Sequence, residues 1–549
     1  MSRLRRLRRW WPVLPVAFLA LLVYAAIPGR STFTVSPETT YVTGPLDAEG
    51  YVDYQTALNQ RLGEGITPET NANVQLWRAL GPRPEGGNGM APEYFWWLGI
   101  NPPPDEGEYF LGSHRYFEDV LKIRQEEEEE KPADWFEEFF GEPEPNEFRF
   151  PPDPRQQWND RLDRTRKWPW KAKERPDVAD WLRRNEKPLA VVAEACRRPK
   201  YFNPLVASPR VGPEEPRLIS CLLPNVQKCR DIANALVCRA MARVGDGDLD
   251  GAWQDLLTCQ RLGRHVAHGG TLIENLVGIA IVMIASDGQL TLLSQSQAPA
   301  DRVRGWLEDL RRLPPMPTFG ETLNRGERFV TLDAMMSLAR NGPGMLDQLA
   351  GPGGPAPAKN RVFGRLFTRS IDWDPALRNA NRMYDECVEA SRLPDRPARQ
   401  KELAKVEAGI KKPTPGPLAR ATMNRTERGE MIGNILIGLL FPALQKVQDA
   451  SDRVRQAERN LHVAFALAAH RADSGRYPGK LDELVPKYLP EVPGDLFSGG
   501  PLIYRPEKDA YLLYSVGPNG ADEDGRGRED APPGDDSRVR MPVPEPKAK

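Results

Sequence analysis

The sequence predicts a mainly α-helical chain that carries a single amino-terminal transmembrane helix and ends in a small α+β part. Three observations lead to this fold class. An uncharged apolar segment follows a cluster of arginines, helical periodicity dominates from residue 177 onward, and two short alternating stretches near the carboxyl end indicate strands. A chain of 549 residues is long enough for roughly two to four domains.

The amino terminus has the features of a membrane anchor. Residues 1–9 contain five arginines and form the expected cytoplasmic basic tail, and the eighteen residues 10–27 contain no charge. At about 1.5 Å rise per residue, a helix over 10–27 can span the hydrocarbon core, and the basic end stays in the cytoplasm. We expect a retained single-pass anchor in the cytoplasmic membrane, with the bulk of the chain extracytoplasmic. A cleaved signal peptide ending near Val23–Ala25 is the alternative.

Charge and cysteine content narrow the function classes. The formal net charge is −1, which gives no electrostatic basis for binding nucleic acid. The six cysteines include no C-x-x-C pair, so zinc ribbons and thioredoxin-like chemistry have no support. We expect buried thiols, and Cys238 with Cys259 is the one pair that a helical hairpin would bring near enough for a disulfide.

Residues 32–175 are rich in proline, tryptophan and charge. Eight of the thirteen tryptophans lie between Trp77 and Trp181, and residues 126–130 are consecutive glutamates. We interpret the charge runs as the solvated faces of a stalk. A docking surface, or a pairing of this acidic stretch with the basic stretch that follows it, is the alternative.

Helical periodicity defines the next parts of the chain. Residues 176–340 are expected to form a helical domain, in which 231–244 and 249–262 resemble one tetratricopeptide-type hairpin around a Gly-Asp turn. A Gly/Pro-rich loop over 341–360 and a helical segment over 361–424 should follow. The remaining predicted helices are 272–284, 300–312, 321–340 and 375–392.

The hairpin turn carries half of a calcium-binding motif. Residues 246–251 match the first half of an EF-hand loop, with carboxylates at its first, third and fifth positions. Leu257 occupies the twelfth position, where a bidentate glutamate belongs. We therefore favour an interhelical turn in which Asp248 caps the second helix.

A second motif offers the best candidates for catalysis. His265 and His268 share one helix face and could bind a metal together with Glu274, although a merely polar helix end is the simpler interpretation. The chain holds no G-x-S-x-G, P-loop or H-E-x-x-H motif. An extracytoplasmic hydrolase, or another enzyme with a non-local active site, is therefore the alternative function and not the first one.

The carboxy-terminal part combines one long helix with strands. A near-heptad apolar stripe predicts a single helix from Arg425 to about Ser474. Two alternating segments, 501–504 and 510–516, predict short strands. The last residues, 521–549, are acidic and rich in Pro and Gly, and we expect them to be a disordered tail.

Three motifs in this part carry a family resemblance. They are Gly475-Arg-Tyr-Pro478, Asp495-Leu-Phe-Ser-Gly499 and Tyr514-Ser-Val-Gly517, in that order after the long helix. Residues 430–530 thus resemble the major pseudopilin of type II secretion and related pilin-like proteins. The resemblance implies a small α+β domain over 425–520, although the processed leader with which a pilin begins is not found ahead of this helix.

The resemblance also implies a calcium site. In the pseudopilin, carbonyl groups and acidic side chains just after the Tyr-Ser-x-Gly strand hold the ion. Here Asp522, Asp524 and Asp530 are the residues that could play this role, because hard carboxylate oxygens suit calcium. A solvated acidic tail is the alternative.

The chain as a whole resembles large membrane-anchored proteins of planctomycete bacteria. The anchor, the Gly-Pro-Arg-Pro-Glu-Gly-Gly segment at 81–87, the helical hairpin and the carboxy-terminal motifs carry this resemblance. It implies a location and an architecture but no activity. We expect a cell-envelope protein with a structural or protein-interaction role, as an accessory of a secretion or pilus-like system, with other envelope proteins as partners and no nucleic acid.

Overall fold

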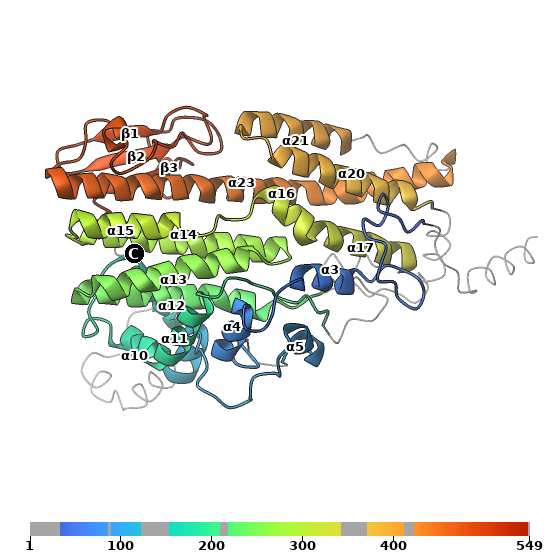
Figure 1. The fold of residues 1–549 in the computed structure, drawn as a ribbon, viewed down its shortest axis with the longest axis horizontal. Helices are drawn as coiled ribbons and strands as arrows, with labels where there is room; N and C mark the ends of the chain where they lie inside the picture. The colour runs from blue at the N-terminus through green and yellow to red at the C-terminus, as the bar shows by residue number, and fades with distance from the viewer. Residues whose placement is uncertain are drawn as a thin grey trace, which may run out of the picture. The chain divides into compact units, whose positions relative to one another are not determined.

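The protein is mainly helical, as predicted. Helices make up 59% and strands 5% of the structure (Figure 1). The predicted anchor at 10–27, the glutamate run at 126–130 and most of the Gly/Pro-rich loop lie outside the described residues. The computed structural model describes residues 33–85, 89–121, 153–208, 218–341, 371–410 and 422–546.

The chain forms two compact units, and each is assembled from segments that are far apart in the sequence. Unit 1 comprises the described residues within Met1–Glu64, Pro204–Leu222 and Phe319–Lys446, and unit 2 comprises those within Gly65–Asn203, Leu223–Thr318 and Val447–Lys549. The domains predicted from the sequence are consecutive segments, whereas these units interleave. The helix α23 (Arg425–Ser474) contributes residues to both units.

Three antiparallel helices form the centre of unit 2. They are α12 (Pro224–Asp246), α13 (Leu249–Ala267) and α14 (Leu272–Gln295). The predicted hairpin helices are confirmed as helices, since α12 ends at Gly247, whose φ of 82° is left-handed, and the Asp248 carboxylate accepts a hydrogen bond from the Gly251 amide at 2.9 Å. The third helix is longer than its predicted range, 272–284.

The helix α14 is the one described helix that is long and apolar enough to cross a membrane. It lies in the middle of the chain, and 67% of its most apolar window is buried inside the protein. Gly263 of α13 and Gly278 of α14 lie so close to the opposite backbone that a side chain at either position would clash. This burial makes α14 a core helix, so its composition is weak evidence for a membrane span.

The described residues within 65–203, which hold most of the tryptophan-rich part of the chain, pack into the core of unit 2. Trp77 and Trp181 are fully buried, and the Trp181 indole donates to the Leu111 carbonyl at 2.8 Å. The tryptophans bury a large apolar area, although the sequence around them is rich in charged residues. The remaining helices of unit 2 are α4 (Ala72–Leu80), α5 (Pro92–Leu98), α6 (Ser113–Tyr116), η1 (Phe117–Leu121), α9 (Pro154–Lys167), α10 (Pro176–Arg184), α11 (Glu186–Ala195) and α15 (Ala300–Arg311).

Unit 1 is built from helices around a buried aromatic core. Phe329, Trp373 and Tyr384 are fully buried in it. The two helices predicted at 321–340 and 375–392 are confirmed, the first with an irregular opening turn. The helices of unit 1 are α3 (Tyr54–Gly63), α16 (Phe319–Thr322), η2 (Leu323–Glu327), α17 (Arg328–Asn341), α20 (Asp374–Ser391) and α21 (Arg396–Ile410).

A three-stranded antiparallel sheet follows α23 and the short helix η4 (Leu481–Leu484). The strands β1 (Ile503–Pro506) and β2 (Tyr511–Ser515) lie within one or two residues of their predicted positions. A third strand, β3 (Ser537–Met541), pairs with β2 and corrects the expectation that 521–549 is disordered. Within β3 the buried Val539 and Met541 alternate with arginines, and this two-residue period is hidden by the acidic composition around it.

The sequence motifs of this part fasten its loops to the sheet and to α23. The buried Asp495 carboxylate accepts hydrogen bonds from the Ser515 hydroxyl at 2.6 Å and from the Val516 amide at 3.2 Å. On α23, the Gln456 side-chain oxygen accepts from the Leu496 amide at 2.7 Å. The Asp-Leu-Phe-Ser-Gly turn is therefore held between the long helix and the end of β2.

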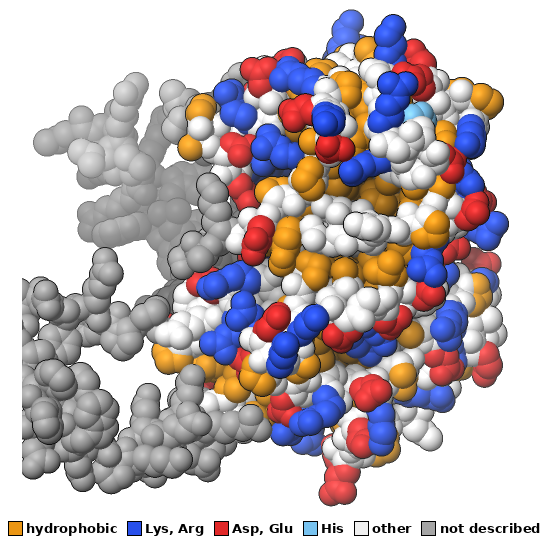
Figure 2. All heavy atoms as spheres, turned by 90° about the vertical axis from the view of Figure 1, so that its left-hand side faces the viewer, with side chains coloured by type: hydrophobic (Ala, Val, Ile, Leu, Met, Phe, Trp, Pro, Cys, Tyr) orange, Lys and Arg blue, Asp and Glu red, His pale blue; other side chains and the backbone are white. Residues whose placement is uncertain are grey.

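Charges of both signs are mixed on the surface. On the face drawn in Figure 2, basic and acidic side chains alternate around a band of hydrophobic ones. The described side chains in that view form no extended patch of one sign. This distribution fits the formal net charge of −1.

Candidate metal centre

The loop that joins β2 to β3 folds around three carboxylates. Glu523, Asp535 and Asp536 each offer one oxygen, and these oxygens all lie within 4.8 Å of one another. Calcium binds its oxygen ligands at about 2.3–2.6 Å, so two ligands of one ion can be up to about 5 Å apart. The three carboxylates are therefore close enough to hold a single calcium ion.

Hydrogen bonds from the same loop fix the direction of each carboxylate. The amides of Glu523 and Gly525 donate to one Asp536 oxygen at 3.2 and 2.8 Å. The Asn519 amide donates to one Asp535 oxygen at 3.2 Å, and the Asn519 side chain donates to Glu523 at 3.1 Å. The acids are thus positioned by backbone donors, which leaves the second oxygen of each aspartate available.

Two oxygens of this cluster are buried without a hydrogen-bond partner. They are Oδ1 of Asp535 and Oδ1 of Asp536, and Asp536 is only 5% exposed. Burial raises the pKa of the Asp536 carboxyl above its usual value. A buried oxygen without a partner costs free energy, and a divalent cation bound to it would compensate that cost. The residues present therefore fit a calcium ion.

The glycine of the Tyr-Ser-x-Gly motif belongs to this arrangement. Gly517 has a φ of 70°, in the left-handed region that favours glycine. A Cβ at this position would clash with the backbone carbonyl and the Oδ1 atom of Asp535. Glycine here lets the end of β2 approach the acidic cluster.

Two of the predicted ligands make other contacts. Asp522 accepts a hydrogen bond from the Tyr514 hydroxyl at 3.0 Å. Asp524 forms an ion pair with Arg505 at 2.9 Å. Both carboxylates thus have partners on the sheet, in Tyr514 of β2 and Arg505 of β1, which are themselves joined by a hydrogen bond of 2.7 Å.

The third predicted ligand is also paired. The Arg538 guanidinium of β3 binds both oxygens of Asp530 and holds the pKa of that carboxyl below its usual value. Asp522, Asp524 and Asp530 are thus not the residues whose oxygens converge; those are Glu523, Asp535 and Asp536 of the same loop. The signal for the two aspartates is their position directly before β3, and β3 itself was not predicted.

The other candidate set, His265, His268 and Glu274, does not form a group of converging ligand atoms in the described structure. The His265 ring stacks on Tyr201 with centroids 6.1 Å apart, and burial lowers its pKa to about 4. The Nδ1 atom of His268 lies 2.7 Å from the Arg264 carbonyl oxygen. These contacts are those of two packed side chains at the end of α13.

Glu274 is fully buried at the start of α14. Its carboxylate accepts hydrogen bonds from Asn203 at 2.7 Å and from the Thr271 amide and hydroxyl at 3.0 and 2.9 Å. Thr271 and Glu274 form a capping box. Burial raises the pKa of Glu274 to about 7, although the hydrogen-bond donors oppose the rise. The geometry gives this acid a structural role as a buried helix cap.

The cysteines are thiols in the structure. All six lie in the described residues, and none forms a disulfide, so the Cys238–Cys259 pair is not linked. Burial raises the pKa of Cys196 to about 12 and that of Cys238 to about 11. High pKa values and burial make such thiols unreactive.

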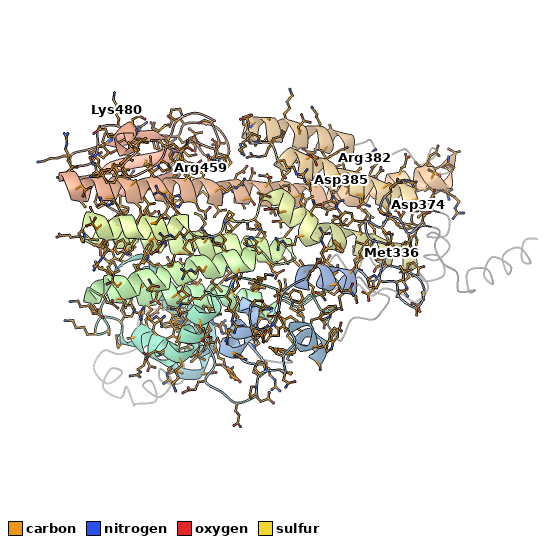
Figure 3. All side chains as sticks on the ribbon, viewed as in Figure 1. Met336, Asp374, Arg382, Asp385, Arg459 and Lys480 are labelled. Carbon is orange, nitrogen blue, oxygen red and sulfur yellow. The ribbon has the colours of Figure 1, made fainter. Side chains whose placement is uncertain are left out.

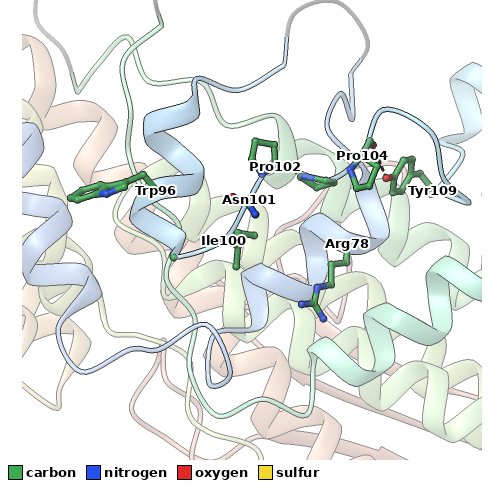
Figure 4. Close-up of a pocket in the computed structure, with 9 residues that line it drawn as sticks. Arg78, Trp96, Ile100, Asn101, Pro102, Pro104 and Tyr109 are labelled. Atoms are coloured by element: carbon green, nitrogen blue, oxygen red, sulfur yellow. Dashed lines mark hydrogen bonds between the residues drawn. The ribbon is translucent and has the colours of Figure 1, made fainter.

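Unit 2 also has an open surface pocket of about 610 Å³ (Figure 4). Arg78 lies at its base, and the prolines 102–104 and Tyr109 form one side. The Tyr109 hydroxyl donates to the Pro104 carbonyl at 2.7 Å, which fixes that side. Trp96 borders the pocket and is 70% exposed, but in Figure 4 its ring points away from Arg78, so the pocket does not enclose a ligand between them.

No known protein family, no curated protein and no solved structure matches this chain. The assignment of the metal centre therefore rests on its own geometry. Within the described residues, the carboxylates of the β2–β3 loop are the group whose oxygens converge.

Proposed function

We propose that this chain is a membrane-anchored envelope protein with a structural or protein-interaction role. We further propose that a calcium ion binds in the loop between β2 and β3 of its carboxy-terminal part. Two observations carry the proposal: the carboxylates of Glu523, Asp535 and Asp536 converge, and each of the two aspartates has one buried oxygen without a hydrogen-bond partner. A bound ion would fasten the loop between β2 and β3 and stiffen the surface at this end of the protein. The predicted anchor at 10–27 supports an extracytoplasmic location, where calcium sites of about 10⁻⁴ to 10⁻³ M affinity operate.

The proposed partners are other envelope proteins. The resemblance of residues 430–530 to the pseudopilin supports an accessory role in a secretion or pilus-like system. The hairpin of α12 and α13, which resembles a tetratricopeptide unit, supports protein binding rather than catalysis. Nucleic acid is not among the proposed partners, in line with the balanced charge.

Thermal unfolding of the purified full-length chain in detergent tests the metal centre. At 1 mM calcium and a dissociation constant near 10⁻⁴ M, binding to the folded state stabilises it by about 1.4 kcal/mol, and the melting temperature rises accordingly. The informative variant is the double substitution Asp535→Asn with Asp536→Asn. It should melt at or above the wild type in chelator, because carboxylate repulsion is removed, and should not respond to calcium.

Two control variants give this experiment its specificity. Glu507→Gln changes an exposed acid in the turn between β1 and β2 and should keep the full calcium response. Asp524→Asn removes a residue of the originally predicted set and should also keep it. A wild-type melting curve that is identical in calcium and in chelator would refute the metal centre. If only Asp524→Asn lost the response to calcium, the ion would instead be bound by the aspartates predicted from the sequence.

Crosslinking in cells tests the interaction role. A tagged full-length chain is crosslinked and purified, and the co-purified membrane proteins are identified by mass spectrometry. Reproducible recovery of secretion or pilus components is the expected result. Purification without any enriched envelope protein would count against the interaction role.

A further inference from the structure

The segment that follows the predicted anchor is bound firmly to unit 1. We call residues 33–53 the strap. At its start, the Thr34 amide donates to the Asp374 carboxylate at 2.7 Å, at the first turn of α20. Further along, the Asn381 side chain of α20 donates to the carbonyls of residues 38 and 39 at 3.1 and 2.9 Å. The strap therefore runs along one helix of its own unit.

The second half of the strap is held by charged and aromatic side chains. Tyr41 has a φ of 63°, which is uncommon for a residue other than glycine, and its ring lies 4.3 Å from the buried Arg328 guanidinium. Arg340 of α17 forms ion pairs with Asp47 at 3.1 Å and with Glu49 at 2.8 Å. Contacts of several kinds thus fix the strap from one end to the other.

The strap leaves little free chain between unit 1 and the predicted anchor. Thr34 stands seven residues after Ile27, the last residue of the predicted span. Seven residues reach at most about 25 Å when fully extended. If the strap were free up to Tyr54, where α3 begins, the same limit would be about 90 Å. The contact between Thr34 and Asp374 therefore sets how far this end of α20 can move from the membrane.

We propose that the strap holds unit 1 against the lipid surface, with the amino-terminal end of α20 nearest to the bilayer. Asp374 marks this end, and Arg382 lies two turns further along the helix (Figure 3). The first residue of α23 lies at the same end, because the Asp372 amide donates to the Arg425 carbonyl at 3.1 Å. This inference rests on the proposed membrane anchor and adds the orientation of unit 1 to it.

The tether, and not a charged patch, accounts for this closeness. Acidic and basic residues occur together at this end of the unit: Asp374 lies 3.8 Å from Arg378, and Glu427 stands beside Arg428. Attraction to anionic lipid headgroups would need an excess of Lys and Arg. The distance of unit 1 from the bilayer should therefore be insensitive to salt.

Energy transfer to the membrane surface tests the orientation. The full-length chain is reconstituted in phosphatidylcholine vesicles that contain a headgroup-labelled acceptor lipid. A donor dye is attached to Arg378→Cys or to Glu389→Cys, which are exposed positions eleven residues apart, or about 16 Å along α20. Cys221→Ser removes the one cysteine that is not buried. We expect stronger transfer from position 378, unchanged between low and high salt.

Release of the strap provides the matched comparison. Asp374→Ala with Asn381→Ala removes the strap's three side-chain hydrogen bonds to α20 and should reduce transfer from position 378, because the tether lengthens. Glu386→Ala with Arg392→Ala alters the same helix outside the strap contacts and should leave transfer unchanged. Circular dichroism confirms that each variant keeps its helical content.

The outcomes separate this inference from the proposed function. Transfer from position 378 that is equal to or weaker than transfer from 389, in protein that resists extraction by alkaline carbonate, would overturn the orientation and leave the anchor intact. Transfer that is unaffected by strap release would overturn the role of the strap. Extraction of the wild-type protein by carbonate would overturn the anchor, and the orientation with it.

Discussion

Replacing Glu274 by glutamine should stabilise unit 2 at high pH relative to the wild type. The carboxyl is fully buried, and no basic residue is among its hydrogen-bond partners. Its donors, Asn203 and Thr271, are neutral and only partly offset the loss of hydration. Glutamine keeps the shape and an acceptor oxygen, and it is accepted at this position of a capping box.

The size and sign of the effect follow from the pKa. Burial raises the pKa of Glu274 from 4.5 to about 7, so the folded state holds the proton more tightly than the unfolded state. This contribution to stability is fully present below pH 4.5 and is lost as the pH rises through 7. A rise of this size corresponds to about 3 kcal/mol at pH 8. The glutamine variant has no proton to lose and should not show the decline.

Urea unfolding between pH 4.5 and 8, followed by tryptophan fluorescence, measures the difference. Trp77 and Trp181 are fully buried in unit 2 and report on its unfolding. The free energy of unfolding of Glu274→Gln minus that of the wild type should increase by about 3 kcal/mol across this range. Glu186→Gln, an exposed acid in unit 2, should give a flat difference. A flat difference for Glu274→Gln as well would refute the argument that burial keeps this acid protonated.

Two further pairs of substitutions in unit 2 test an ion pair and the helix packing by thermal unfolding. Arg264→Met should destabilise the protein by about 3 kcal/mol, because it leaves the partly buried Glu458, 2.5 Å away, without its cation, and adding Glu458→Gln should recover part of the loss. Gly278→Ala should destabilise by about 1 to 3 kcal/mol because its Cβ would clash with α13, whereas Gly305→Ala, with open space around it on α15, should stabilise by up to about 1 kcal/mol. A recovery of zero in the first pair, or equal effects of the two alanines, would contradict these expectations.

The elements that could be predicted are those with local signals. The helix α23 begins and ends where predicted, since a long apolar stripe defines it and Gly475, with a φ of 77°, follows it. The α12–α13 turn was recognisable because Asp248 combines a turn residue with an N-cap. In both cases the information lies within one continuous segment of the chain.

The features that could not be predicted depend on contacts between distant segments. Asn71 pairs with Lys200 in an isolated bridge, and Asn59 exchanges hydrogen bonds with the Leu205 backbone at 2.8 Å. Such contacts join distant segments into one unit, and no local sequence pattern predicts them. The charge runs that suggested a stalk are visible in the sequence, whereas the segments that bury Trp77 and Trp181 are not.

Glu274 and Asp536 show why a buried acid cannot be assigned a role from its sequence neighbours. Both carboxyl groups are buried and have raised pKa values. Both oxygens of Glu274 accept hydrogen bonds, so a proton suffices to neutralise it. Asp536 has one unpaired oxygen, and two further carboxylates lie within reach of it. A single proton would leave this group partly charged, whereas a divalent cation would compensate its charge. The number of donors around each oxygen therefore separates a helix cap from a candidate metal ligand, and that number is set by donors that only the folded chain brings into place.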